Sequence, residues 1–377
     1  MPCLNEAETL GTCIAKAKEV IIELEIEAEI IVADNGSDDG SQEIARELGA
    51  RVVLVAEKGY GNALMGGIAA SRGRYIIMGD ADDSYDFREI PRFIEKLRAG
   101  YDIVQGCRLP AGGGQVMPGA MPFLHRWLGN PLFSFMVRKM FGAPIHDVYC
   151  GLRGFSRRLY DDLDLRCTGM EFATEMVIKS SLFSKQFAEV PITLHPDGRQ
   201  STHPHLRTFR DGWRTLRFFL MYCPRWLFLI PGLLLMVLGL VGYGLALPGT
   251  TIAGATLGAH SLLFASLAIL LGFQSVQFAV FTKTFAITEG LLPMDRRMQT
   301  LFRVVNLERG LLIGTVALLC GAVLSVWAVN EWRMVEFGRL EYARTMRLVI
   351  PGVTLVALGF QTILSSFFVS ILGMARK

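Results

Sequence analysis

Three carboxylates stand close together at Asp80-Ala81-Asp82-Asp83, directly after the apolar run YIIMG. Carboxylates two positions apart on a turn can share one hard cation such as Mg²⁺ or Mn²⁺, and that cation can neutralise a diphosphate. A second D-x-D pattern, Asp162-Leu163-Asp164, has no strand pattern before it, and we expect a solvated helix end there. The pattern therefore predicts a metal site at Asp80 and Asp82.

Other polar groups allow a functional and a structural interpretation in equal measure. Lys58-Gly59-Tyr60-Gly61 is either a plain turn or a glycine turn that opens a helix near a phosphate. Glu171 and Glu175 lie one helical turn apart, and they either orient a sugar or act as a base, or form a solvated helix face. A guanidinium fork matches phosphate oxygens, although each such arginine is equally a plain surface charge. The candidate phosphate-binding arginines are Arg108, Arg138 and Arg153.

Short apolar runs alternate with helical patterns around these residues. Alternation of this kind predicts an α/β fold with a mainly parallel sheet and helices on both faces. Ligands of such sheets bind at the carboxyl ends of the strands, where Asp34, Asp80 and Arg108 stand. The expected strands are 29–33, 51–55, 75–79 and 102–106, and the expected helices are 41–48, 61–71 and 90–99.

Charge is distributed unevenly along the 377 residues. Only 17 of the 73 Asp, Glu, Lys and Arg residues follow Arg225, so the last 152 positions are about 11% charged. The first 225 positions are about 25% charged, which is ordinary for a soluble domain. This division excludes both a purely soluble protein and a purely membrane-embedded one.

Four uncharged apolar runs follow Arg225, and each is long enough to cross a hydrocarbon core of about 30 Å. They contain no Asp, Glu, Lys, Arg or His, which favours anchoring over transport. We expect domains at 1–203 (catalytic), 204–225 (an interfacial amphipathic helix) and 226–377 (membrane). The expected spans are 226–247, 261–281, 311–329 and 349–372, with Pro231 and Pro351 near the starts of the first and last.

Lys and Arg in the short loops predict the orientation in the membrane. Loop 248–260 has none, loop 282–310 has five, and the tail ends in Arg376-Lys377. We therefore expect a multi-pass protein of the cell membrane with the catalytic domain and both termini in the cytoplasm. Loop 331–348 is the exception, because it carries arginines on the predicted outer side. They are Arg333, Arg339, Arg344 and Arg347, near Glu331, Glu336 and Glu341.

The segment before the first span has an apolar stripe at helical spacing beside a stripe of arginines. This pattern is typical of a helix in the headgroup plane, and the alternative is an ordinary helix on the soluble core. The apolar stripe is Leu206, Phe209, Trp213, Leu216 and Leu220, and the arginines are Arg207, Arg210, Arg214 and Arg217.

Several classes of function are disfavoured by composition. The first 225 residues carry 27 basic and 29 acidic side chains, which argues against a nucleic-acid partner. Seven scattered cysteines without C-x-x-C indicate neither a disulfide framework nor a zinc site. The first 30 residues lack the apolar core of a cleavable signal peptide.

In combination, the polar motifs resemble glycosyltransferase family 2, an inverting GT-A family that uses nucleotide-sugar donors. The resemblance starts with Pro2-x-x-Asn5-Glu6, continues through the Asp34–Ser41 and Lys58–Ala63 segments, and includes Asp80-x-Asp82. Three later motifs, followed by membrane helices, narrow the resemblance to the polyprenyl-phosphate hexosyltransferases, including dolichyl-phosphate mannose synthase. These motifs are Asp147-x-x-x-Gly151-x-Arg153, Glu171 to Glu175 and Gly198 to Ser201.

The resemblance implies a role for each matching residue. Pro2, Asn5 and Glu6 would surround the nucleotide, with Asp34 on the base or ribose and Lys58 and Arg108 near the donor phosphates. Asp80 would support the diphosphate site and Asp82 would be the principal ligand of Mg²⁺ or Mn²⁺. Residues expected at the acceptor phosphate are Arg138, Arg153 and Ser201, and the expected catalytic set is Asp80, Asp82, Arg153, Glu171 and Glu175.

Two departures from the family pattern stand out. Members of the family have a strand before P-x-x-N-E, where this sequence has Met1, so we expect the natural chain to begin further upstream. Asn35 replaces the usual second aspartate and supplies no carboxylate.

The expected function is transfer of a hexose from a UDP- or GDP-linked donor to a polyprenyl (undecaprenyl or dolichyl) phosphate. A homo-oligomer is one expected state of the enzyme. One alternative is a processive polysaccharide synthase, although Tyr222 stands where the Q-x-x-R-W signature of those enzymes has glutamine. Another alternative, from a different class, is a non-catalytic membrane scaffold that keeps the fold.

Overall fold

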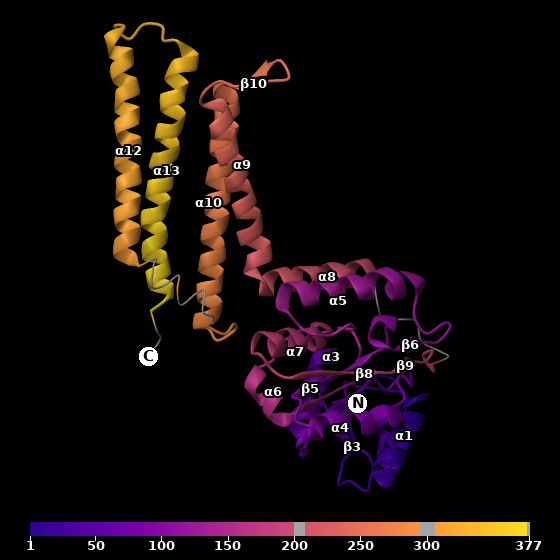
Figure 1. Ribbon diagram of the computed structural model, residues 1–377. Coiled ribbons are helices and arrows are strands. Elements are labelled where there is room, and N and C mark those ends of the chain that lie inside the picture. Colours follow the sequence, from indigo (N-terminus) through magenta and orange to yellow (C-terminus); the bar gives the residue numbers. More distant parts are fainter. Residues whose placement is uncertain (200–207, 295–299, 301–305, 375–377) are drawn as a thin grey trace. The chain divides into compact units, whose positions relative to one another are not determined.

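The computed structural model describes residues 1–199, 208–294, 300 and 306–374. The chain divides into two compact units, Met1–Phe219 and Leu220–Lys377. The division falls inside helix α8 (Thr208–Tyr222), so most of this helix belongs to the first unit. The units are described separately below (Figure 1).

The first unit contains two larger sheets. One has the order β1-β2-β3, and all of its strands are parallel, with Pro2 opposite Ala33 and Ile31 opposite Arg51. The other has the order β4-β7-β5-β8, with β5 and β8 parallel. The strands are β1 (Pro2–Cys3), β2 (Ile31–Asp34), β3 (Arg51–Leu54), β4 (Tyr75–Met78), β5 (Ile103–Cys107), β7 (Arg153–Ser156) and β8 (Phe187–Pro191), with a small parallel pair β6 (Gln115–Val116) and β9 (Thr193–Leu194).

The four strands expected from the sequence are confirmed within two residues at each end, and the mainly parallel α/β fold is confirmed with them. Strand β7 was not expected, and it lies antiparallel between β4 and β5. Its sequence, Arg-Gly-Phe-Ser, has neither an apolar run nor a clear alternation. Gly154 packs closely there, because a Cβ atom would lie 2.7 Å from Cδ1 of Ile77.

The helices of the first unit use their apolar faces to cover the sheets. In α4, for example, Phe93 and Leu97 lie four residues apart and are buried with Val104 and Leu152 in one core cluster. The expected solvated end at Asp162 and Asp164 is confirmed, because both side chains are exposed where α6 ends. The helices are α1 (Leu10–Glu23), α2 (Ser41–Glu47), α3 (Tyr60–Ala70), α4 (Ile90–Arg98), α5 (Asn130–Phe141), α6 (Arg157–Leu163), α7 (Glu171–Leu182) and α8, with a π-helical turn η3 (His125–Gly129) before α5.

Helices α5 and α8 lie side by side in the first unit (Figure 1). The rings of Phe133 and Phe219 meet edge to face at 5.9 Å, and Gly212 faces the ring of Phe133. The inward face of α8 is thus the one with Gly212 and Phe219, whereas Trp213 of the expected apolar stripe points away from the core and is 62% exposed. An ordinary core-facing helix would bury that tryptophan. Leu206 and Arg207, also in the expected stripes, lie outside the described residues.

The second unit holds four long apolar helices, as expected. Each has the length and composition of a membrane span, with mean hydropathy between 1.8 and 2.3. They extend beyond the uncharged runs, so Pro351 lies inside α13 and not near its start. The helices are α9 (Ile230–Ala246, preceded by the π-helical turn Arg225–Leu229), α10 (Ala259–Thr288), α12 (Leu307–Met334) and α13 (Tyr342–Leu372), and a short hairpin β10–β11 (Thr251–Ile252 and Ala255–Thr256) joins α9 to α10.

Small residues allow these helices to approach closely. A Cβ atom on Gly232 would meet the carbonyl of Gly272, and one on Gly314 would meet the carbonyl of Gly359. Apolar side chains gain little from association in lipid, so close backbone packing and interhelical hydrogen bonds stabilise such bundles. The hydroxyl of Tyr243 takes part in two such hydrogen bonds, one with the hydroxyl of Ser266 (2.6 Å) and one with the hydroxyl of Thr354 (3.2 Å).

Candidate active site

Two loops meet where β1 and β4 end. The hydroxyl of Thr9 donates to the carbonyl of Ala81 at 2.7 Å, and this bond is buried. It ties the loop after β1, which carries Asn5 and Glu6, to the loop after β4, which carries Asp80 and Asp82. The predicted nucleotide and metal residues therefore come together from two strand ends, as an α/β sheet requires.

Asp80 is held firmly at the end of β4. One carboxylate oxygen accepts a hydrogen bond of 2.8 Å from the hydroxyl of Tyr60, and the other faces Gly151, where a Cβ atom would collide with it. Burial, together with the charge of Asp82, raises the pKa of Asp80 to about 6 against the opposing effects of Tyr60 and Arg108. Two carboxylates are thus kept close together although they repel each other, which favours a shared cation.

Asp82 has both a fixed and a more open oxygen. Oδ1 accepts bonds from the amide (3.0 Å) and hydroxyl (2.6 Å) of Ser84, and Oδ2 lies 3.9 Å from Nη2 of Arg199. Oδ2 of Asp82 therefore faces the guanidinium cation of Arg199.

Arg199 was not among the expected site residues, yet it connects three carboxylates. It pairs with Glu6 at 3.1 Å and with Asp197, besides approaching Asp82. Burial and the charge of Asp82 raise the pKa of Glu6 to about 7, although Arg199 opposes this shift. The motif Gly198 to Ser201 was the available sequence signal, but it did not identify the arginine as the functional residue.

The carboxylate of Asp34 stabilises the loop that follows β2 through hydrogen bonds. Its carboxylate accepts bonds from the amides of Gly36 (2.9 Å) and Ser37 (3.1 Å) and from the side chain of Gln42 (2.9 Å), and the residue is 1% exposed. In this structure the carboxylate is thus occupied by protein donors, and it shapes the turn after β2.

The side-chain amide of Asn35 forms three hydrogen bonds with the backbone. Nδ2 donates to the carbonyls of Val55 (3.0 Å) and Glu57 (2.8 Å), and Oδ1 accepts from the amide of Gly59 (2.7 Å). An aspartate could not donate the first two bonds. The departure from the family pattern therefore fixes the loop after β3, whose Lys58 donates to the carbonyl of Asn35.

The guanidinium of Arg108 is engaged by protein partners, which disfavours the expected contact with a donor phosphate. Its guanidinium forms two hydrogen bonds with the carboxylate of Asp147, at 2.7 and 2.9 Å, and a third with the hydroxyl of Tyr85 at 3.3 Å. Burial would lower the pKa of Arg108, but Asp147 raises it well above its usual value. The pair is connected through the hydroxyl of Tyr85 to the amide of Gly151.

The placements of Arg153 and Glu175 run against their expected contacts with ligand. Arg153 is completely buried, and its guanidinium donates to the carbonyls of Cys150 and Ala173, so a phosphate cannot reach it. Glu175 is also completely buried and pairs with Lys179 at 2.9 Å. Burial would raise the pKa of Glu175, but the amide of Cys167 and Lys179 lower it, so this carboxylate is a poor base.

The remaining expected site residues lie in different surroundings. Glu171 lies at the start of α7, mostly buried, and pairs with Arg214 of α8 at 2.9 Å. Arg138 of α5 donates to the carbonyl of Ile145 at 3.2 Å. Ser201 lies outside the described residues. Asn5, whose backbone is left-handed (φ +60°), accepts from the amide of Asp38, and Pro2 pairs within the sheet.

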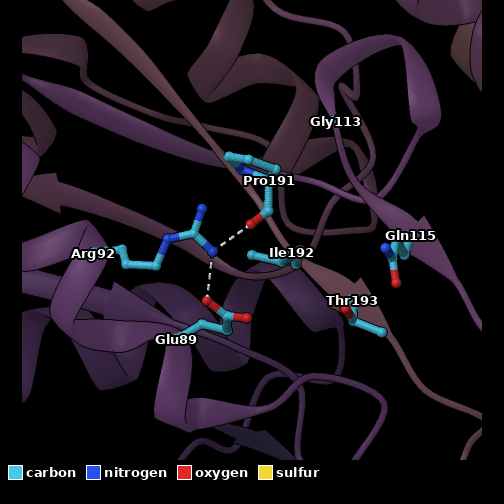
Figure 2. A pocket seen from close by; sticks show the side chains of 7 residues that line it. All are labelled: Glu89, Arg92, Gly113, Gln115, Pro191, Ile192 and Thr193. Carbon is cyan, nitrogen blue, oxygen red and sulfur yellow. Dashed lines mark hydrogen bonds and ion pairs between the residues drawn. The ribbon is translucent and has the colours of Figure 1, made fainter.

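A shallow hollow of about 230 Å³ lies elsewhere on the first unit, beside α4 and β8 (Figure 2). In it Arg92 is engaged by Glu89 and by the carbonyl of Pro191, both at 2.7 Å. The lining contains none of the residues expected at the donor or the metal, so we do not assign the active site to it.

Comparison with known proteins agrees with the architecture. Residues 1–164 match the model of glycosyl transferase family 2, and residues 280–373 match that of the glycosyltransferase family 2 C-terminal transmembrane region. A low-salt glycan biosynthesis hexosyltransferase of Haloferax volcanii, Agl6, is 37% identical over 99% of this chain and 88% of its own length. A dolichyl-phosphate hexose transferase of the same organism is 33% identical over 51% of this chain and 79% of its own length.

Among solved structures, one similar to this chain is glucosyl-3-phosphoglycerate synthase of Mycobacterium tuberculosis in complex with Mn²⁺, UDP and glucosyl-3-phosphoglycerate. Its TM-score is 0.45 at 20% identity, covering 59% of this chain and 77% of that one. The match to Agl6 extends over both the first and the second unit, and the resemblance expected from the motifs is confirmed. The chain therefore belongs to glycosyl transferase family 2 and is a membrane glycosyltransferase.

Proposed function

We propose that the enzyme transfers one hexose, with inversion, from a UDP- or GDP-linked sugar to a polyprenyl phosphate. The observation that carries the donor half is the pairing of Asp80 and Asp82 beside Glu6 and Arg199 at the carboxyl end of β4. The acceptor half is supported by an apolar surface next to α8 and by the dolichyl-phosphate hexose transferase among the relatives.

The residues at the donor site fit a divalent cation. Among the described residues, no three His, Cys, Asp or Glu side chains form a metal site by themselves. Mg²⁺ is commonly held by one or two carboxylates together with substrate phosphates and water. Asp80 and Asp82 would hold Mg²⁺ or Mn²⁺, and that ion would neutralise charge on the departing diphosphate.

The apolar surface lies on η3, on α5 and on the two residues before η3, and we call it the α5 face. Its side chains are apolar, large and between 43% and 78% exposed. Two cations lie on its aromatic rings, Arg126 over Trp127 and Lys139 over Phe135. Apolar residues with interleaved cations are typical of a surface that lies among lipid headgroups. The α5 face consists of Phe123, Leu124, Trp127, Leu128, Leu132 and Phe135.

Arg126 replaces Arg138 and Arg153 as our candidate for the acceptor phosphate. Its Nε is buried and has no hydrogen-bond partner among the described residues, and its guanidinium lies 5.2 Å from the centre of the Trp127 ring. Arg138 and Arg153 donate to backbone carbonyls instead. A π-helical turn such as η3 is frequent at functional sites.

Transfer needs little proton chemistry. A phosphate monoester is largely ionised at pH 7, so its oxygen can attack the anomeric carbon while the bond from that carbon to the diphosphate breaks. The residues of this chain would position the two substrates and neutralise the charge of the leaving group. Glu171, held by Arg214, would orient the sugar without acting as a base.

The decisive experiment supplies membranes containing the protein with labelled UDP-glucose and GDP-mannose in separate reactions, and follows the label into the lipid phase. We expect one donor to give a lipid carrying a single hexose, in a reaction that requires a divalent cation and polyprenyl phosphate. Label in a water-soluble polymer would instead identify a processive synthase. Absence of both transfer and donor hydrolysis would indicate a non-catalytic scaffold.

The loop charges support an orientation with the catalytic unit and both termini in the cytoplasm. Protease accessibility of the first unit in sealed vesicles of known orientation tests this assignment. Protection of the first unit in right-side-out vesicles, with cleavage in inverted ones, is the expected result.

A further inference from the structure

One end of the helical bundle is rich in arginine without an obvious reason. The β10–β11 hairpin and the turn from α12 to α13 lie at this end, away from the start of α9 (Figure 1). Arginines in short loops are unusual on the outer side of a membrane, which is the side that the loop charges predict for this end. The four are Arg333, Arg339, Arg344 and Arg347.

Two of these arginines have local explanations. Arg333 lies in the last turn of α12, where a cation is stabilised by the helix dipole. Arg344 lies 3.6 Å from Glu331, which it can partly neutralise. Arg339 is exposed in the turn and needs no partner other than water.

Arg347 has no such explanation. It is half-buried, and its Nε is shielded from solvent without a hydrogen-bond partner among the described residues. The guanidinium reaches from α13 to Gly249 in the connection from α9 to α10, where a Cβ atom would collide with Nη2. This connection, residues 247–258, contains no acidic residue. A shielded N–H donor without an acceptor among the described residues is costly, so a ligand that supplies acceptor oxygens to this guanidinium is favoured.

The surroundings of Arg347 favour an anion in two further ways. Glu341 precedes α13 but makes no capping bond, and the first turn of the helix contains no acidic residue, so its amides and dipole also attract negative charge. Arg344 stands one turn from Arg347 on the same helix.

The neighbouring surface favours a lipid over a soluble anion. Trp332 and Phe337 pack edge to face with ring centres 5.0 Å apart, and both are exposed. Ile252 of the hairpin and Val335 are exposed as well. Aromatic and apolar side chains around cations are typical of the boundary between acyl chains and headgroups.

We propose that Arg347, together with Arg344 and the first turn of α13, binds the phosphoryl headgroup of an anionic membrane lipid at this end of the bundle. The guanidinium fork of Arg347 would donate two hydrogen bonds to phosphate oxygens, while the acyl chains would lie along the apolar helices. This site is separate from the donor site and does not require hexose transfer.

The test measures lipid binding to the full-length protein in detergent by native mass spectrometry, with dioleoylphosphatidylglycerol as the probe. We expect Arg347→Gln to weaken binding about tenfold or more, because a charge-assisted pair of hydrogen bonds is lost. Arg339→Gln removes the same charge from the same end and should change binding less than twofold. Hexose transfer should be equal in both variants, which shows that each has folded.

Three outcomes would overturn the proposal. Equal loss of lipid in the two variants would show a general effect of charge, and no loss in either would show that Arg347 is not a ligand. Displacement of the lipid by millimolar inorganic phosphate would indicate a site for a soluble anion. Should Arg347→Gln not fold, Arg347→Lys keeps the charge but loses the fork, so it should bind severalfold more weakly, and unchanged binding would contradict the assignment.

Discussion

The hydroxyl of Tyr60, at the start of α3, donates a hydrogen bond of 2.8 Å to Asp80, at the end of β4. With Gly151 packed against the other oxygen, the carboxylate of Asp80 cannot turn away from Asp82. The fold therefore maintains a repulsive pair of carboxylates, which costs stability when no cation is present. This cost can be measured.

Asp80→Asn should stabilise the metal-free protein at high pH. Because burial raises the pKa of Asp80 to about 6, the stability that this group contributes is complete below its unfolded pKa of about 4 and is lost as the pH rises through 6. At pH 8 in a chelator we expect the variant to unfold with a free energy about 2 kcal/mol higher than the wild type, with the difference vanishing near pH 4. Denaturant unfolding of the solubilised protein at both pH values measures this, and a less stable variant at pH 8 would contradict it.

Asp82→Asn should abolish transfer without unfolding the protein. Its Oδ1 can still accept both bonds from Ser84, so the loop is kept, but the charge that would hold a cation is gone. We expect a fall of about 100-fold or more in the rate of transfer at saturating Mn²⁺. Asp164→Asn, in the exposed D-x-D at the end of α6, is the matched control and should retain full activity. Comparable activity of the two variants would eliminate Asp82 as a metal ligand.

Asn35→Asp, which restores the residue usual in the family, should destabilise this protein. Two backbone carbonyls would lose their donor in a buried place, and the amide of Gly59 alone would remain as a partner. We expect a loss of about 2 to 3 kcal/mol in the free energy of unfolding. The control is Asn62→Asp, where one exposed bond to the carbonyl of Lys58 is lost and the change should stay below about 1 kcal/mol.

The sequence predicted those elements whose apolar pattern is set by burial. Strands β2 to β5 and the four long helices have runs or alternations that few other structures explain. Strand β7 was not predicted from the sequence, because its residues include a buried arginine and a closely packed glycine. A strand lying between two others is defined by its neighbours, and these are distant in the sequence.

The site was predictable where residue type alone determines chemistry, as for Asp80 and Asp82. It was not predictable where burial decides the role, because a charged residue is expected at the surface. Arg153 and Glu175 are the examples, and both are completely buried. For Glu175 a signal existed in Lys179 four residues later, a spacing that pairs opposite charges on a helix.

Arg126→Gln should weaken use of the acceptor without affecting the donor. If its guanidinium contacts the lipid phosphate, the KM for polyprenyl phosphate should rise about tenfold or more, while the KM for the nucleotide sugar stays constant. Arg126→Lys keeps the charge and should recover part of the loss. Arg138→Gln, on the neighbouring helix, should leave both constants nearly unchanged. A larger rise of the KM for polyprenyl phosphate in Arg138→Gln than in Arg126→Gln would restore Arg138 as the residue at the acceptor phosphate.

Trp127→Ser should impair transfer to acceptors that lie in a bilayer. The bundle anchors the protein with or without this side chain, so the expected effect concerns the position of the site relative to the headgroups and not membrane attachment. Trp127 is 58% exposed on the α5 face, and its loss removes apolar area that would otherwise be buried among lipids. We expect transfer to polyprenyl phosphate in vesicles to fall severalfold, whereas transfer to a short-chain, water-soluble phosphate acceptor stays unchanged. Ile22→Ser on α1 removes another exposed apolar side chain, 75% exposed and away from α5, and should affect neither reaction. An equal effect of both substitutions would show that the α5 face has no special contact with lipid.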